Sequence, residues 1–277
     1  MDIGRLRHGK ENFYGTASLI VGTLGWLVLL VVTMGGVLLF GVFALVSLFI
    51  AGRMLRAALF GGAVQVTERQ FPKVHAILQE SARAMGVAKL PTMFVLNSHG
   101  ITNAVAVKVL SGRYILLYSE LIDLLHEEDG DRQLRMIIAH ELAHHRAGHL
   151  NIMLNTLRVP AMILPSLGGA YSRAREYTAD RIAAACVGDK VACQRALMAL
   201  ALGSDVLRDE ADIEQFKQQE KQIPGFFGYF HELLSTHPRM TRRVAALDRL
   251  FEDRRLIAAS PGVSASSAPM RDALPAR

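Results

Sequence analysis

The feature that most constrains the fold of this chain is a long run without charge. No charged residue lies between Glu11 and Arg53, and residues 17–51 are almost wholly apolar. Such a run is too long for the apolar part of a secretory signal peptide and lacks a small-residue cleavage site, so we expect it to be retained. We therefore predict that residues 17–51 lie in a membrane.

The length of the run favours two crossings over one. About 35 residues of helix would extend roughly 52 Å, whereas the hydrocarbon core of a bilayer is about 30 Å thick. A single helix would need a tilt outside the usual range. We expect a helical hairpin with short crossings at residues 17–33 and 37–53, joined by a turn at Gly35 and Gly36.

Basic residues on both sides of the run predict its orientation. Three precede it and four follow it: Arg5, Arg7, Lys10, Arg53, Arg56, Arg69 and Lys73. Because basic flanks stay on the cytoplasmic side of a membrane, both flanks are expected in the cytoplasm. We predict a multi-pass protein of the cell (inner) membrane whose larger domain faces the cytoplasm.

The formal net charge of +6 leaves two classes of partner to consider. A basic domain can lie against anionic lipid headgroups, or it can bind nucleic acid. Because the sequence contains no basic patch interleaved with aromatic residues, we expect the lipid bilayer and no nucleic acid.

Catalytic chemistry is indicated by residues 140–144, which read H-E-L-A-H within a predicted helix at residues 131–148. Positions four residues apart share a helix face, so His140 and His144 can reach one metal ion. Glu141 points too far aside to bind that ion, but it can take a proton from a metal-bound water. The pattern is typical of catalytic zinc, and the alternative is an amphipathic helix with two surface histidines.

Catalytic zinc takes three protein ligands and keeps one position for water, so the site needs a third ligand. Glu176 and Asp180 again lie four residues apart on a second predicted helix. One carboxylate could complete a His₂Glu site, and the other could accept the outer N–H of a ligand imidazole. Arg173, Arg175 and Arg181 surround them, so spacing alone equally allows a solvated helix with Arg–Glu pairs.

Together these motifs resemble a known family. H-E-L-A-H, followed at residues 172–180 by S-R-A-R-E-Y-T-A-D, is similar to the membrane-embedded gluzincin endopeptidases. These are the HtpX-type proteases and their relatives, the CAAX prenyl proteases. Three further segments share the resemblance, which covers roughly residues 65–250: residues 102–106, residues 119–125, and residues 236–238 together with Arg243.

The resemblance implies a zinc endopeptidase and assigns a role to each motif residue. Three side chains would bind one zinc ion: His140, His144 and Glu176. Glu141 would be the general base, and Asp180 would hold a ligand imidazole from outside. His237 would lie near the oxyanion that forms during peptide hydrolysis.

Residues 92–96, 101–110 and 113–117 are rich in β-branched and aliphatic side chains and are predicted to be strands. Proteases of this type bind substrate as an extra strand along an exposed sheet edge. Asn103 and Ala104 are the candidate substrate-binding residues there. An ordinary core strand is the alternative interpretation.

A second apolar stretch, residues 151–171, is not expected to cross the membrane. Only 31 residues separate His144 from Glu176, and two crossings would need about 40. One crossing would place the two ligands on opposite sides. Pro160 and Pro165 favour a bent helical hairpin or a shallow interfacial segment. The HtpX-type relatives have a transmembrane pair here, so the chain departs from them.

The sequence also predicts the structure of two further segments, residues 66–85 and residues 226–230. Residues 66–85 are predicted to form an amphipathic helix with Phe71 facing inward. The aromatic cluster at residues 226–230 is expected to pack in the core, with a substrate cleft or the bilayer as the alternatives.

The remaining histidines and cysteines have simpler expected roles. His145 and His149 do not share the direction of the ligand pair and are expected to be polar surface residues. Cys186 and Cys193 are expected to be free thiols, since seven residues of helix would separate their Cα atoms by about 10 Å.

The sequence therefore predicts an α+β, predominantly α fold: an N-terminal transmembrane helical hairpin followed by a zincin-type metallopeptidase domain with a small β-sheet. The expected divisions are a cytosolic segment, the hairpin, the peptidase domain and a disordered tail: residues 1–16, 17–56, 64–256 and 257–277. The expected function is zinc-dependent hydrolysis of membrane or membrane-associated proteins. Membrane protein quality control is one role that such an enzyme would serve. The alternatives are a protease for prenylated C-terminal peptides and a non-catalytic membrane scaffold; the oligomeric state is left open.

Overall fold

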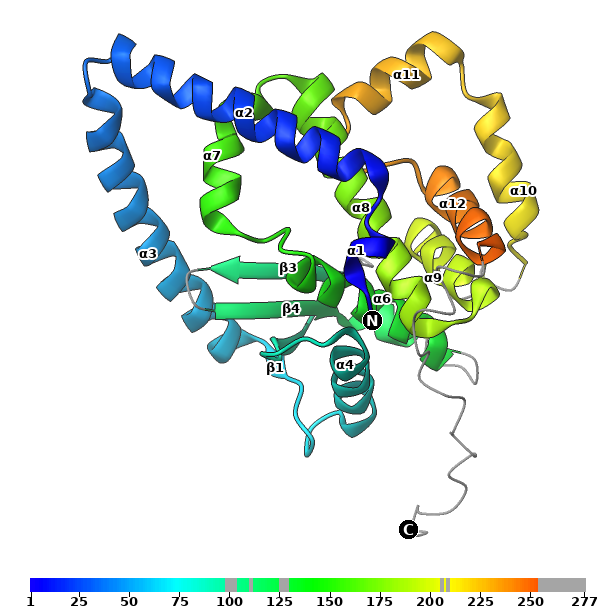
Figure 1. The fold of residues 1–277 in the computed structure, drawn as a ribbon. Coiled ribbons are helices and arrows are strands. Elements are labelled where there is room, and N and C mark those ends of the chain that lie inside the picture. The colour runs from blue at the N-terminus through cyan, green and yellow to red at the C-terminus, as the bar shows by residue number, and fades with distance from the viewer. Residues whose placement is uncertain (98–103, 110–111, 125–129, 205–206, 208–209, 254–277) are drawn as a thin grey trace.

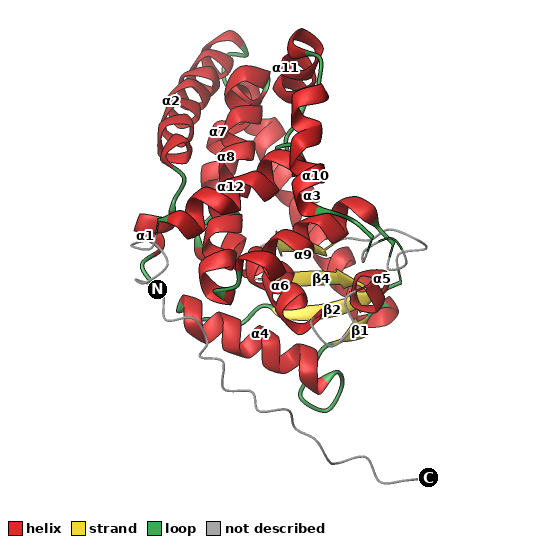
Figure 2. Ribbon diagram, turned by 90° about the vertical axis from the view of Figure 1, so that its right-hand side faces the viewer, coloured by secondary structure: helices red, strands yellow, loops and turns green. Residues whose placement is uncertain are grey.

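The computed structural model of the chain describes residues 1–97, 104–109, 112–124, 130–204, 207 and 210–253. This part is mostly helical, with one small sheet (Figures 1 and 2), which confirms the predicted fold class. The helices are α1 (Ile3–Leu6), α2 (Gly9–Val32), α3 (Gly36–Gly62), α4 (Pro72–Met85), α5 (Ser119–Leu124), α6 (Gly130–Arg146), α7 (Ile152–Met162), α8 (Pro165–Val187), α9 (Lys190–Leu202), α10 (Ile213–Gln218), the 3₁₀-helix η1 (Gln219–Gln222), α11 (Gly225–Leu234) and α12 (Met240–Glu252). The strands are β1 (Val64–Gln65), β2 (Thr92–Leu96), β3 (Ala104–Val109) and β4 (Gly112–Tyr118).

The two long apolar helices, α2 and α3, are joined where the sequence predicts the turn. Met34 and Gly35 both adopt positive φ there, 50° and 86°, which reverses the chain in two residues. Both helices are long and apolar enough to cross a membrane, and none of the most apolar stretch of α3 is buried in the protein. They extend beyond the predicted crossings, because α2 begins at Gly9 and α3 ends at Gly62.

The two apolar helices diverge from their turn (Figure 1), and α2 packs against α7 and α8 instead of along α3. Gly22 makes this close packing possible, since a Cβ added there would lie 2.2 Å from the carbonyl oxygen of Leu157. Gly25 has the same role against Pro160, at 2.5 Å from its Cβ. The first apolar helix is therefore fixed to the rest of the fold.

Trp26 completes the contact between α2 and α7. Pro160 lies inside α7 and has no N–H to donate to the Thr156 carbonyl four residues earlier. The indole Nε1 of Trp26 donates to that carbonyl at 2.9 Å. The α7 and α8 helices form the bent hairpin predicted for residues 151–171; whether that hairpin contacts a membrane stays a prediction.

The sheet has the strand order β1-β2-β4-β3. The β2–β4 pair is parallel, and β1–β2 and β3–β4 are antiparallel. The three predicted strands are present as β2, β3 and β4, and β3 forms one edge of the described sheet. Asn103 lies outside the described residues.

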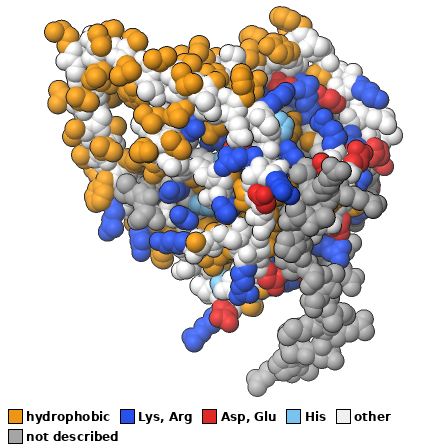
Figure 3. Space-filling view, in the orientation of Figure 1, with side chains coloured by type: hydrophobic (Ala, Val, Ile, Leu, Met, Phe, Trp, Pro, Cys, Tyr) orange, Lys and Arg blue, Asp and Glu red, His pale blue; other side chains and the backbone are white. Residues whose placement is uncertain are grey.

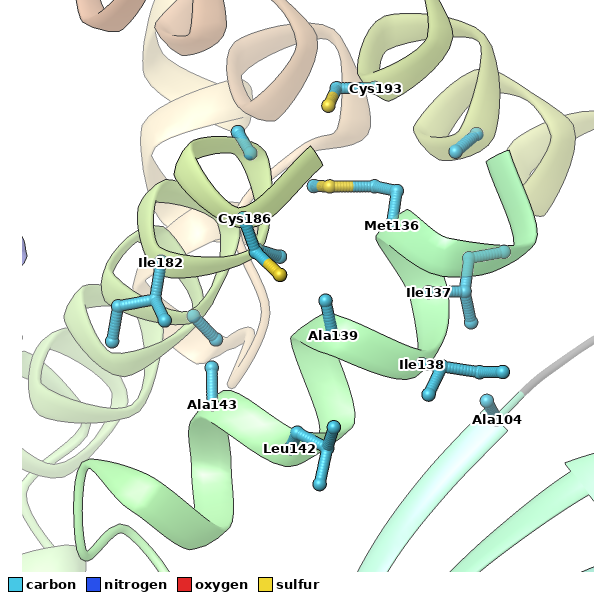
Figure 4. Packing of buried hydrophobic residues seen from close by; sticks show 14 of the residues in the cluster. Ala104, Met136, Ile137, Ile138, Ala139, Leu142, Ala143, Ile182, Cys186 and Cys193 are labelled. Atoms are coloured by element: carbon cyan, nitrogen blue, oxygen red, sulfur yellow. The ribbon is translucent and has the colours of Figure 1, made fainter. Parts of the chain in front are cut away.

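The core is built around α6, which is covered by α4, α8, α9 and the sheet. Ala139 and Ala143 of α6 point toward α8, which carries Ile182 and Cys186 (Figure 4). All four are fully buried. Small side chains at this contact let the two helices approach closely, so that polar residues one turn away on each helix can meet.

Two sequence expectations need correction, and a third is confirmed. The amphipathic helix begins only at Pro72, because a residue before proline avoids helical geometry, and Phe71 is partly exposed with φ of 64°. The aromatic cluster is not in the core: Phe226, Phe227, Tyr229 and Phe230 are 51–74% exposed, because only Gly228 of α11 is buried. The cysteines are free, as expected, and both are buried. The predicted disordered tail lies outside the described residues.

Candidate metal centre

The α6 helix places two imidazoles on one face. His140 and His144 are separated by one helical turn, and their Nε2 atoms lie 3.2 Å apart. His140 is buried and His144 is half-buried. The H-E-L-A-H run therefore forms the side-by-side histidine pair that its spacing predicts.

Glu176 of α8 brings a carboxylate to the same point. Its oxygens lie 3.6 Å from Nε2 of His140 and 3.4 Å from Nε2 of His144. Ligand atoms bound at about 2.1 Å to a tetrahedral zinc ion are about 3.3 to 3.4 Å from one another. Each imidazole thus lies near a different oxygen of Glu176 at a separation close to the tetrahedral one, and one ligand atom from each of the three residues lies within 4.8 Å of the others.

The charges around these donors also suit a divalent cation. Three buried carboxylates, those of Glu141, Glu176 and Asp180, are accompanied by one buried guanidinium, that of Arg243. Two negative charges are left for a dication to balance. Burial lowers the pKa of His140, but the Asp180 and Glu176 carboxylates raise it to about 10, so the site attracts positive charge.

Asp180 supports His140 from outside. Its Oδ1 lies 2.9 Å from Nδ1 of that imidazole, on the opposite side of the ring from the donor atom. Arg243 of α12 donates two hydrogen bonds to Asp180, from Nε at 2.8 Å and Nη2 at 2.7 Å. Burial opposes ionisation, but Arg243 and His140 hold the pKa of Asp180 below its ordinary value. The two carboxylates of the E-x-x-x-D motif thus both lie beside His140, and the roles that the resemblance implies for them stay predictions.

The outer nitrogen of His144, Nδ1, contacts His149, for which the expected surface position is wrong. His149 is only 1% exposed, and its Nδ1 lies 2.9 Å from Nδ1 of His144. The chain leaves the helix after Arg146, and Gly148, with φ of 80°, turns it back beneath the ligand. A glycine at the end of the helix was the signal available in the sequence. His145 is half-buried and contacts the Tyr114 carbonyl, so it is not a free surface residue either.

The contact continues from His149 to Glu11 of α2. Nε2 of His149 lies 3.2 Å from Oε1 of Glu11, which is 2% exposed and also pairs with Arg7. Sequence reasoning used Glu11 only as the boundary of the apolar run. Because 138 residues separate it from His149, no local pattern joins the two.

Glu141 lies beside the donor set at the edge of the sheet. It is 8% exposed, and burial raises the pKa of its carboxyl, which the nearby His140 charge opposes. The carboxylate also accepts a hydrogen bond from the backbone of Ala106 in β3. An acid with a raised pKa beside the donor atoms is suited to receive and return a proton.

His237 reaches the site from the segment before α12. Its Nδ1 lies 3.3 Å from Oε2 of Glu176, while its side chain is 67% exposed. The hydrogen bond with Glu176 raises the pKa of the His237 imidazole. The residue borders the cleft and faces a carboxylate of the donor set; its contact with an oxyanion stays a prediction.

A cavity of about 540 Å³ opens over these residues. Ala104, Val105 and Ala106 of the edge strand line one wall, and the donor set lines the other. The candidate residue Ala104 therefore borders the site. Another cavity of about 710 Å³ lies against α8 and α12, but it does not contain His140, His144 or Glu176.

Comparison with known proteins agrees with this geometry. The chain is 34% identical over 117 residues to a protein named "Protease HtpX homolog" from Halobacterium salinarum, covering 42% of the chain and 36% of that protein. It is 27% identical over 177 residues to "Plastoglobule-localized metallopeptidase 48, chloroplastic" of Arabidopsis thaliana, covering 58% of the chain and 49% of that protein. The matches span less than half the length of either relative. No solved structure matches the chain.

The sequence profile of Peptidase family M48 matches residues 68–167 and 152–250, which together form most of the chain and contain all three donors. The two apolar helices that precede this region are compatible with membrane association. The chain therefore belongs to peptidase family M48.

Proposed function

We propose that the chain is an integral-membrane zinc endopeptidase that hydrolyses peptide bonds of membrane or membrane-associated proteins. The observation that carries the proposal is the convergence of two imidazoles and one carboxylate at tetrahedral separations, with a buried acid beside them. Family membership supports metal-dependent peptide hydrolysis, and a His₂Glu donor set favours zinc.

The proposed mechanism assigns one task to each side chain. A zinc ion held by His140, His144 and Glu176 would supply a nucleophilic water near neutral pH and polarise the peptide carbonyl. Glu141 accepts the proton of the attacking water and returns it to the leaving amine. His237, whose pKa is raised, donates a hydrogen bond to the oxyanion.

The edge strand β3 is proposed to hold the substrate. The backbone of Ala106 donates a hydrogen bond to Glu141, and β3 is an edge strand of the described sheet. The backbone groups on the open side of β3 therefore border the cleft. An extended peptide pairing with them would pass over the donor set with little dependence on its sequence. Asn103 precedes this strand in sequence and stays a candidate substrate-binding residue.

The membrane part of the proposal rests on exposed apolar surface. Hydrophobic side chains cover the part of the molecule formed by α2 and α3 (Figure 3), and many are more than half exposed, including Phe40, Phe43 and Leu39. The aromatic side of α11 lies at the same end of the molecule as the α2–α3 turn (Figures 1 and 2). A soluble protein rarely exposes so large an apolar area. We propose two crossings, with the peptidase domain in the cytoplasm.

Proteolysis by the purified full chain tests the enzymatic part. We expect casein cleavage that a zinc chelator abolishes and that added zinc restores. Glu141→Gln should keep zinc stoichiometry but lose about 10²- to 10⁴-fold in rate, because the proton acceptor is gone. Glu68→Gln, the same change at an exposed loop position, is the matched control. Equal cleavage by Glu141→Gln and the control would contradict the proposal.

Two cysteine substitutions test the topology. Met34 is 94% exposed in the α2–α3 turn, and Lys89 is exposed on the peptidase domain. A membrane-impermeant maleimide should label Met34→Cys on intact cells and Lys89→Cys only after permeabilisation. The native thiols of Cys186 and Cys193 are buried, so they should give little background. Labelling of Lys89→Cys on intact cells would contradict the proposed orientation.

A further inference from the structure

An unbroken line of buried polar contacts leads from the metal centre to the first apolar helix. It joins His144 of α6, His149 of the turn after it, and Glu11 of α2, with contacts of 2.9 Å and 3.2 Å. Arg7 ends the line by pairing with Glu11, and it also donates to the carbonyl of Ala147 at 2.6 Å. Two segments far apart in sequence, residues 7–11 and 144–149, meet there.

The two ends of the line determine where each proton lies. His144 turns Nε2 toward Glu176, so in the neutral ring that binds a cation the proton is on Nδ1. This N–H donates to Nδ1 of His149, which leaves the second proton of the pair on Nε2 of His149. That N–H donates to the carboxylate of Glu11. Every donor then has an acceptor, and the ring of His144 is fixed in its orientation.

The location of Glu11 needs an explanation. It is the acid in the first turn of α2, an otherwise apolar helix, yet it is 2% exposed. A carboxylate is costly to bury unless it is paired and hydrogen-bonded. Its neighbour His8 is also fixed, since its backbone N–H donates to Oγ1 of Thr178 on α8, two residues after Glu176. The chain before α2 is therefore anchored on both sides of the donor set.

We propose that Glu11 is a positioning residue of the metal centre, which orients the ligand His144 through His149. The first apolar helix is then a structural part of the metal site as well as a membrane anchor. This inference rests on the proposed zinc site. It concerns residues 7–11, which lie before the region that matches the family.

Metal binding by the full chain in detergent tests this proposal. We expect Glu11→Gln to weaken zinc affinity by about 10- to 100-fold, because a neutral amide replaces the charged acceptor of the His149 N–H and weakens the support of the ligand imidazole. The affinity is measured by competition with a chromophoric chelator, and the visible spectrum of the cobalt-loaded protein reports ligand geometry. Ser18→Ala is the matched control, because Ser18 is fully buried on the same helix and its hydroxyl donates to the Gly15 carbonyl of that helix.

Two further variants separate positioning from a loss of folding. His149→Gln keeps an acceptor for His144 and a donor for Glu11, whereas His149→Phe keeps neither. We expect His149→Gln to retain affinity close to that of the wild type and His149→Phe to lose as much as Glu11→Gln. The double variant of His149→Phe and Glu11→Gln should bind zinc no more weakly than His149→Phe alone, because both act through one contact line.

The outcomes distinguish this inference from the proposed function. If the wild-type chain binds neither zinc nor cobalt, the proposed function fails. If the wild type binds one ion but Glu11→Gln matches Ser18→Ala in affinity and cobalt spectrum, the positioning role of Glu11 is overturned. Equal affinity for His149→Gln and His149→Phe would overturn it in the same way.

Discussion

The two histidines of the metal centre are supported in different ways. His140 contacts a carboxylate directly: Asp180 lies at 2.9 Å, and Arg243 holds that carboxylate with two hydrogen bonds. All three side chains are buried. We call this the direct arm of the site, and all of its residues lie inside the region that matches the M48 family.

His144 reaches a carboxylate only through a second imidazole. His149 stands between it and Glu11, and the arginine at the end, Arg7, has a side chain that is 31% exposed. We call this the relayed arm. Its last two members lie outside the family region, on the segment that leads into the apolar helices. The region that matches the family therefore contains the residues that support His140. The support of His144 depends in addition on the N-terminal segment.

Asp180→Asn should lower the unfolding free energy and the zinc affinity more than any change in the relayed arm. It removes the closer of the two carboxylates that pair with the buried Arg243, the other being Glu176 at 3.6 Å, and we expect it to lower the unfolding free energy by about 3 kcal/mol. Zinc affinity should fall with it, because His140 loses its carboxylate partner. Chemical unfolding of the full chain in detergent, compared with Glu11→Gln, gives the measurement. If Glu11→Gln destabilises the chain as much as Asp180→Asn, the distinction between the arms is wrong.

The two terminal arginines give the next comparison. Arg243→Gln removes a guanidinium with a side chain only 7% exposed, whereas Arg7→Gln removes one that water already screens. We expect a decrease of several kcal/mol in unfolding free energy for Arg243→Gln and about 1 kcal/mol or less for Arg7→Gln. Thermal unfolding of the two variants, side by side, checks the order. The reverse order would show that the relayed arm is the stronger one.

His145→Gln should have the smallest effect on zinc affinity and stability. It serves as the control for whether changes near α6 disturb the site in general. His145 lies next to a proposed ligand but turns toward the sheet, where its Nε2 contacts the carbonyl of Tyr114 at 3.2 Å. We expect zinc affinity to stay within about twofold of the wild type and stability to fall by about 1 kcal/mol. A tenfold loss of zinc affinity would show that any change near α6 disturbs the site. The distinction between the direct and the relayed arm would then be unsupported.

The residues of the metal centre were predictable from sequence because their spacing follows helical periodicity. His140 and His144 share one face of α6, and Glu176 and Asp180 share one face of α8, so both pairs can be recognised from their spacing. The turn at Gly35 is similarly local. What the sequence could not give is the packing of α6 on α8, which decides that the four side chains meet.

The relayed arm was missed because the contact that joins its two parts, from His149 to Glu11, depends on tertiary structure. His149 lies five residues after His144 and would point away on a continuous helix, but the positive φ of Gly148 returns it. Glu11 comes from a helix that packs on α7 and α8 through Gly22, a contact with no repeating pattern in sequence. The exposed aromatic residues of α11 were misassigned for a similar reason, since hydrophobicity alone does not say which surface a helix covers.

Anomalous diffraction at the zinc absorption edge, from crystals of the full zinc-loaded chain, tests the central claim most directly. We predict one zinc ion about 2.1 Å from Nε2 of His140, Nε2 of His144 and a carboxylate oxygen of Glu176, with His149 turned to the far side of His144. A zinc peak that His149 binds directly, or one more than 4 Å from Glu176, would contradict it.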